Sequence, residues 1–109
     1  MQIKRILDET LRKDLKPNKV LVLLGPRRVG KTELLKKFAS ETNEQSLFLN
    51  GDDIQTHNFL KQRSSENYNR LLGDIRLLII DEAQEIEDIG HKLKLMVDTI
   101  DGLKVLISG

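Results

Sequence analysis

The chain contains no cysteine. A disulfide framework, a thiolate-bound zinc site and a thiol nucleophile are therefore excluded. Aromatic residues make up only 4% of the sequence, which leaves little material for stacking on nucleic-acid bases. Neither sign of charge dominates, because 18 Lys and Arg residues face 17 Asp and Glu residues. The resulting formal net charge of +1 gives no indication of a nucleic-acid partner.

Long apolar runs are also missing. The longest, Val20–Leu24, is far too short to cross a membrane. The first 15 residues are charged and amphipathic and do not resemble a secretory signal. These features predict a cytoplasmic protein with no membrane partner. A length of 109 residues has room for one domain, and 39% hydrophobic residues indicate a globular chain, so we expect a single domain over residues 1–109.

Short apolar segments alternate with helical patterns along the chain. Four segments predict strands, at residues 19–24, 46–50, 76–80 and 104–108, and the continuous apolar runs of the first and third predict burial on both faces of a parallel sheet. Apolar residues spaced by three and four predict helices before Pro17, over 31–41, within 54–72 (one or two helices) and over 89–100. This alternation predicts an α/β fold with a mostly parallel sheet and helices on both faces.

The segment GPRRVGKT, residues 25–32, follows the first predicted strand and matches the phosphate-binding loop G-x-x-x-x-G-K-[ST]. Gly25 would let the chain leave the strand sharply, and Gly30 can adopt backbone angles closed to other residues. The loop amides and the start of the next helix would form a nest for anions. Lys31 would reach the β- and γ-phosphates of a nucleotide, and Thr32 would offer its hydroxyl to Mg²⁺.

We therefore predict one continuous nucleotide-binding segment. It consists of Gly25, Pro26, Arg27, Arg28, Val29, Gly30, Lys31, Thr32 and Glu33. For the two arginines two interpretations remain open. They would contact phosphate or a neighbouring subunit, or they would face solvent or pair with the acidic stretch at residues 81–88.

A second motif, LLIIDE, places two carboxylates at the end of the third predicted strand. Asp81 would hold Mg²⁺, directly or through water, opposite Thr32. Glu82 would polarise the attacking water as a catalytic group, together with Lys31. The base-reading motif N-K-x-D of small GTPases does not occur in the sequence, so ATP is favoured over GTP. In parallel sheets ligands bind beyond the carboxyl ends of strands, where both motifs lie.

Weaker features allow a structural and a functional interpretation. Asp52 and Asp53 follow the second strand and would either approach the nucleotide or simply form a turn. Gln84 would contact the substrate water or a partner, or be an exposed residue of a first helical turn. His57 and His91 have no metal-ligand spacing and are expected on the surface.

Taken together, these motifs resemble the N-terminal ATPase part of a prokaryotic AAA-like ATPase family. The resemblance rests on GPRRVGKT, LFLNGDD, LLIIDEAQ and KVLISG, and it covers nearly the whole chain. It implies a P-loop NTPase core, with Lys31, Thr32, Asp81 and Glu82 as nucleotide, Mg²⁺ and catalytic residues. It also implies that Ser108 and Gly109 begin the segment that carries a polar sensor for the γ-phosphate.

The same resemblance implies a strand order of 5-1-4-3-2. The fifth strand, the arginine finger and a C-terminal domain would follow residue 109, so the chain is expected to be an N-terminal fragment, truncated after the fourth strand. The first strand would then lie at an edge of the sheet. Hydrolysis by this chain alone is expected to be weak.

Three functions fit these observations to different degrees. The first is an ATPase domain that binds ATP and Mg²⁺ and hydrolyses the γ-phosphate. The second is a nucleotide-gated module that binds protein or nucleic acid without significant hydrolysis. The third, a helicase-like motor, is suggested only by DEAQ, and the near-neutral charge does not favour it. The sequence is compatible with a homo-oligomer and identifies no other physiological partner.

Overall fold

A computed structural model describes residues 11, 13–23 and 30–109. Its elements are β1 (Lys19–Leu23), α2 (Lys31–Glu41), β2 (Ser46–Asn50), α3 (Ile54–Leu60), α4 (Ser65–Leu72), β3 (Leu77–Asp81), the 3₁₀ turn η2 (Ala83–Glu85), α5 (Ile89–Thr99) and β4 (Lys104–Ser108). The alternation of strands and helices confirms the predicted α/β fold. Each strand lies within one residue of its predicted position, and the region 54–72 forms two helices.

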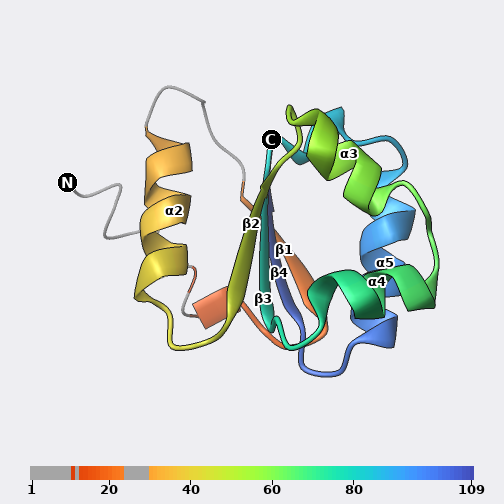
Figure 1. Ribbon diagram of the computed structural model, residues 1–109. Coiled ribbons are helices and arrows are strands. Elements are labelled where there is room, and N and C mark those ends of the chain that lie inside the picture. Colours follow the sequence, from red (N-terminus) through yellow and green to blue (C-terminus); the bar gives the residue numbers. More distant parts are fainter. Residues whose placement is uncertain (1–10, 12, 24–29) are drawn as a thin grey trace.

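The four described strands form one parallel sheet in the order β1-β4-β3-β2. This order agrees with the part of the order 5-1-4-3-2 that falls within the chain. β3 and β4 are central, and β1 and β2 are the edges (Figure 1). The register pairs Leu23 with Ser108 and Asn50 with Asp81, so the carboxyl ends of the strands lie level with one another.

Helices cover both faces of the sheet, as expected. α2 lies on one face, and α3, α4 and α5 lie on the other (Figure 1). Alternate residues of β3 divide between the two cores. Leu77 and Ile79 pack with Leu35 of α2, whereas Leu78 and Ile80 pack with residues of the three other helices. All five residues of β3 are buried, as a continuous apolar strand in a two-sided parallel sheet requires.

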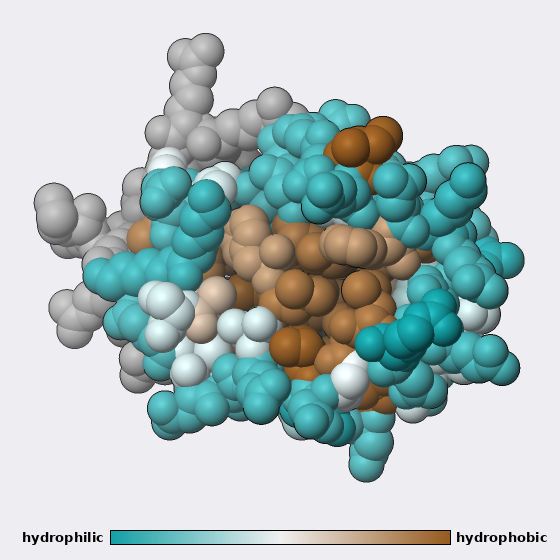
Figure 2. Space-filling model, viewed as in Figure 1, coloured by the Kyte–Doolittle hydropathy of each residue, from teal (hydrophilic) through white to brown (hydrophobic). Residues whose placement is uncertain are grey.

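The edges of the sheet are less well covered than its centre. The apolar run of the first strand predicted burial on both faces, and this was wrong: Val22 of β1 is 51% exposed, as the edge position implied by the family resemblance requires. In Figure 2 apolar side chains gather where Figure 1 places β2, and hydrophilic residues surround them. Leu47 and Phe48 of β2 are only half-buried. The best-covered strands are therefore β3, in which all five residues are buried, and β4, in which three of five are buried.

Asn18 fixes the point at which the chain enters β1. It has a left-handed backbone (φ 60°), which asparagine tolerates better than most residues. Its side-chain Nδ2 donates to the carbonyl oxygens of Val97 and Ile100, at 2.7 and 2.9 Å. Its Oδ1 accepts from the backbone N–H of Gly102 at 3.0 Å. One side chain thus connects β1 to the end of α5 and to the turn before β4.

We predict that Asn18→Ala lowers the free energy of unfolding by about 2–5 kcal/mol, from lost hydrogen bonds and a left-handed alanine. Asn18→Gly should lose less, because glycine adopts positive φ without strain. Urea denaturation measures both. Asn43→Ala is the control, since Asn43 is exposed. Equal stability of Asn18→Ala and the wild type would show that the side chain is no anchor.

Candidate functional site: the carboxyl ends of the strands

Polar residues from several elements meet at the carboxyl ends of the strands. Asp81 is the last residue of β3, and Ser108 is the last residue of β4. α2 begins at this end of the sheet, where the chain also leaves β4 (Figure 1). Thr32, in the first turn of α2, therefore lies beside residues that are 49 and 76 positions away in the sequence. The parallel sheet brings these side chains together, as its topology predicts.

The Asp81 carboxylate is the centre of this cluster. Its side chain is almost completely buried, with 3% exposure. Thr32 donates its hydroxyl to Oδ2 at 2.5 Å, and Ser108 donates its hydroxyl to Oδ1 at 2.5 Å. The backbone N–H of Glu82 also donates to Oδ1, at 3.0 Å. Both oxygens therefore accept hydrogen bonds, which a buried carboxylate requires in order to stay ionised.

Two opposing effects set the pKa of Asp81. Burial, the largest single influence, raises the pKa. Hydrogen bonds from Ser108, Thr32 and the Glu82 amide, together with the positive charge of Lys31, lower it by more. The pKa consequently lies below the ordinary value of an aspartate, and Asp81 carries a negative charge at neutral pH.

The start of α2 supplies the positive side of the site. Lys31 is the first residue of the helix, and it is buried with 7% exposure. Gly30 precedes it with a left-handed backbone (φ 70°), as the sequence predicts for this glycine. Glu33, also predicted to bind nucleotide, is an exposed residue of the first turn. The other predicted nucleotide-binding residues, Gly25, Pro26, Arg27, Arg28 and Val29, lie outside the described residues.

Glu82 follows Asp81 in a left-handed conformation (φ 54°), so its half-buried side chain leaves the line of the strand. Gly51, which follows β2, packs directly against the backbone of Glu82. A Cβ atom on Gly51 would overlap the Glu82 carbonyl group, and the Gly51 N–H donates to the Asp81 carbonyl at 2.7 Å. The Glu82 carboxylate accepts a hydrogen bond from Gln84 Nε2 at 3.0 Å.

The weaker candidates take mainly structural positions. Asp53 caps α3 by accepting from the Gln55 N–H at 2.9 Å, and Asp52 is exposed. His91 is exposed and pairs with Asp88, as a surface residue would. The surface prediction for His57 was wrong, because it is half-buried and its Nε2 lies 2.6 Å from the Gly51 carbonyl oxygen.

Two residues of the site were not predicted in these roles. Ser108 was expected only as the start of a sensor segment, and no role was expected for Gly51. The hydrogen bond from Ser108 to Asp81 follows from the pairing of β3 with β4, in which Ile80 faces Ile107. That pairing also follows from the implied strand order, so this signal was present in the resemblance.

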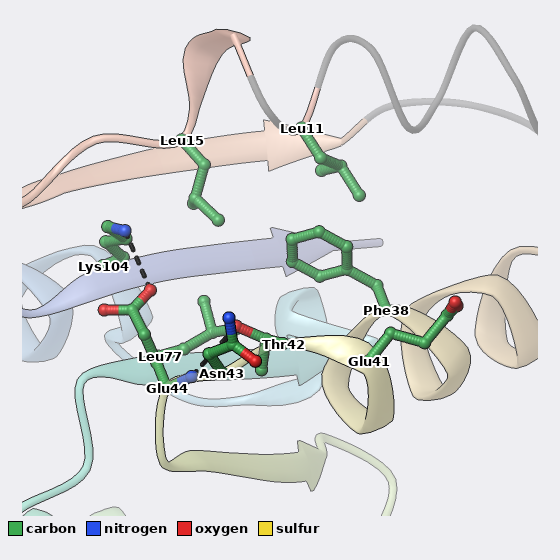
Figure 3. Close-up of a pocket in the computed structure, with 9 residues that line it drawn as sticks. All are labelled: Leu11, Leu15, Phe38, Glu41, Thr42, Asn43, Glu44, Leu77 and Lys104. Carbon is green, nitrogen blue, oxygen red and sulfur yellow. Dashed lines mark hydrogen bonds and ion pairs between the residues drawn. The ribbon is translucent and has the colours of Figure 1, made fainter.

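A cavity of about 320 Å³ lies at the opposite end of the sheet. It is bordered by Leu77 and Lys104, the first residues of β3 and β4, and by Phe38 near the end of α2 (Figure 3). An ion pair of 2.8 Å between Lys104 and Glu44 lies at its wall. The cavity is therefore separate from the cluster around Asp81.

The described residues contain neither a complete cluster of metal ligands nor a helix that could cross a membrane. Within residues 11, 13–23 and 30–109, no group of three or more His, Asp or Glu residues could hold a metal ion on its own. No helix in this part of the chain has the length and apolar character needed to cross a membrane. A metal ion at Asp81 would thus need oxygen ligands from elsewhere, such as water or a bound phosphate.

Comparison with known proteins gives one finding. A family model described as an AAA domain matches residues 17–109, which is most of the chain. The matched region includes every residue of the cluster around Asp81. A search of curated proteins found no match.

We predict that Ser108→Ala raises the pKa of Asp81, because it removes one of the hydrogen bonds that hold this pKa down. A titration of the Asp81 carboxyl carbon by NMR measures the change. Ser40→Ala is the matched control, since Ser40 is exposed and its hydroxyl donates to the Lys37 carbonyl within α2, away from Asp81. An unchanged pKa in Ser108→Ala would contradict the electrostatic account of the site.

The Ser108→Ala variant also tests whether the ionised Asp81 carboxylate stabilises the folded protein. A carboxyl whose pKa is depressed by folding stabilises the protein above its unfolded pKa, and this contribution is lost as the pH falls through the folded pKa. Ser108→Ala should therefore be less stable than the wild type at neutral pH, by about 1.5–3 kcal/mol. The difference should shrink in acid, as urea denaturation at several pH values would show.

Proposed function

The chain belongs to the AAA domain family, and from this premise we propose that it binds ATP with Mg²⁺ and hydrolyses the γ-phosphate by attack of water. The observation that carries the proposal is the hydrogen bond between Thr32 and Asp81, 2.5 Å long, which joins the start of α2 to the end of β3. Motifs that are separate in the sequence thereby become one site. Buried Lys31 lies beside them and its charge acts on Asp81.

The donor set suits Mg²⁺. The ion prefers oxygen ligands, takes few of them from protein and keeps several waters. Thr32 offers a hydroxyl oxygen and Asp81 offers an ionised carboxylate, so these two residues would hold the ion together with phosphate oxygens. When bound, Mg²⁺ would supply positive charge at the β- and γ-phosphates.

The remaining steps belong to the chain's own residues. Lys31 would place a fixed positive charge against the phosphates, where negative charge accumulates during transfer. Glu82 would orient the attacking water and accept its proton. Its left-handed backbone separates its carboxylate from that of Asp81, so the two neighbouring acids can serve different roles. The bond that breaks joins the γ-phosphorus to the β–γ bridging oxygen, and ADP leaves with that oxygen.

We predict that saturating ATP with Mg²⁺ raises the melting temperature of the chain by about 10–20 °C. A ligand at 100 times its Kd stabilises a protein by about 2.7 kcal/mol, and each kcal/mol shifts the melting of a domain this small by about 4–8 °C. Lys31→Ala should abolish the shift. Lys37→Ala, which changes an exposed lysine of the same helix, should retain it.

Two further measurements separate binding from hydrolysis. Glu82→Gln should keep the shift with ATP while phosphate release falls to background, because glutamine cannot accept the proton. A parallel melt with GTP reports the base preference. A wild type whose melting ATP and Mg²⁺ leave unchanged would contradict the proposal, and hydrolysis that survives in Glu82→Gln would contradict the role of Glu82.

A further inference from the structure

The turn between β2 and α3, residues 50–53, lies against the backbone of the two adjacent acids. Gly51 is buried in this turn, and its N–H donates to the Asp81 carbonyl at 2.7 Å. A Cβ atom on Gly51 would overlap the carbonyl group of Glu82, so the two backbones are in direct contact. On its other side the Glu82 carbonyl accepts from the Glu85 N–H at 3.1 Å. Gly51 is therefore one wall of the space that the Glu82 peptide group occupies.

His57 of α3 holds the other half of Gly51. The imidazole is half-buried, and its Nε2 lies 2.6 Å from the Gly51 carbonyl oxygen. A carbonyl oxygen can only accept a hydrogen bond, so Nε2 carries the proton and His57 is the donor. The N–H of Gly51 is thus bound by β3 and its carbonyl by α3.

The other hydrogen bonds of this turn are local. The Asn50 carbonyl accepts from the Asp53 N–H at 3.0 Å, and Asn50 Oδ1 accepts from the Asp52 N–H at 2.9 Å. These bonds join residues two and three positions apart, so they shape the turn without fixing it against the rest of the molecule. The His57 bond connects the turn to the following helix and fixes the plane of the peptide group after Gly51.

We propose that His57 is a positioning residue of the site. Through the Gly51 carbonyl it holds this glycine against the Glu82 backbone, and so fixes the point at which the Glu82 side chain begins. The proposal concerns the position of that backbone, whatever the carboxylate itself contacts. It rests on the proposed function and deepens it, because it names a residue on another element on which the placement of the proposed water-orienting acid depends.

The first test separates positioning from binding. His57→Leu should lower kcat for ATP hydrolysis by about 10- to 100-fold, the range expected when a catalytic group is displaced by about 1 Å. The Kd for ATP with Mg²⁺ should change by less than about twofold, because the displaced group acts in the transition state and not in ground-state binding. His57→Gln places an amide N–H near the position of Nε2, so it should recover most of the lost rate. His91→Leu, which changes an exposed histidine, is the matched control and should keep full activity.

A second control separates positioning from loss of stability. Ser64 Oγ accepts from the Asn67 N–H at 3.1 Å and caps α4, on the same face of the sheet. Ser64→Ala should therefore destabilise the protein and leave kcat unchanged at a temperature where both variants are folded. If Ser64→Ala loses kcat as His57→Leu does, or if His57→Gln is as slow as His57→Leu, the proposal is overturned.

The second test uses Gly51 itself. Gly51→Ala should slow hydrolysis, because its methyl group displaces the Glu82 carbonyl. Gly90→Ala is the matched control, since a Cβ atom there would meet open space. In the Gly51→Ala background His57→Leu should cost less than in the wild type, since the contact that His57 maintains is already lost. Additive costs in this double-mutant cycle would overturn the link from His57 through Gly51.

The third test does not depend on hydrolysis. The NMR resonances of the Gly51 carbonyl carbon and of the Glu82 amide should move in His57→Leu, move less in His57→Gln and stay unchanged in His91→Leu. The ¹⁵N spectrum of the wild-type imidazole should show a proton on Nε2 of His57. A Glu82 amide that does not respond to His57→Leu, or a neutral His57 protonated on Nδ1 alone, would overturn the inference whatever the rate of hydrolysis.

The outcomes also distinguish the two proposals. A wild type that does not hydrolyse ATP would overturn the proposed function and, with it, the catalytic consequence of the His57 contact. A wild type that hydrolyses ATP, loses activity in Glu82→Gln and keeps it in His57→Leu would leave the proposed function standing and overturn the inference. Slow hydrolysis in His57→Leu, with unchanged ATP binding and rescue by His57→Gln, supports both.

Discussion

The buried charge of Asp81 is the constraint on which the arrangement of this site depends. An ionised carboxylate with 3% exposure is costly unless donors surround it. Those donors come from α2, from β4 and from the following residue of the chain, and Lys31 adds a positive charge nearby. The requirement can be met only if β4 lies beside β3 and α2 begins at the same end of the sheet, which the order β1-β4-β3-β2 provides. The topology and the charge therefore support each other.

The parts of the structure that the sequence predicts are those set by local patterns. The apolar run before Asp81 predicts a buried strand because a two-sided parallel sheet leaves no polar face, and all of β3 is buried. The glycine at position 30 predicts a positive φ, which the start of α2 has. The family resemblance adds the strand order. The AAA domain match, over residues 17–109, agrees with that resemblance.

The parts that were missed depend on non-local packing. Val22 looks like any core residue of its apolar run, and its 51% exposure follows instead from the edge position of β1, which only the family resemblance implied. Gly51 reads as an ordinary turn glycine, whereas its role comes from the Glu82 backbone, 31 residues later, pressed against it. His57 is half-buried, and its Nε2 lies against the carbonyl oxygen of the same glycine. Position in the sequence alone contains no information on these contacts.

Two adjacent acids thus end in opposite environments. Asp81 is buried, accepts three hydrogen bonds and has little freedom to move. Glu82 has a left-handed backbone, its side chain is half-buried, and its carboxylate accepts a hydrogen bond from the exposed Gln84 amide. In the proposed function, rigidity suits Asp81, because the oxygens that would hold a cation keep their positions. The left-handed backbone at Glu82 ends the strand that fixes Asp81 and takes the second carboxylate out of the line of that strand, so the two adjacent acids need not share one role.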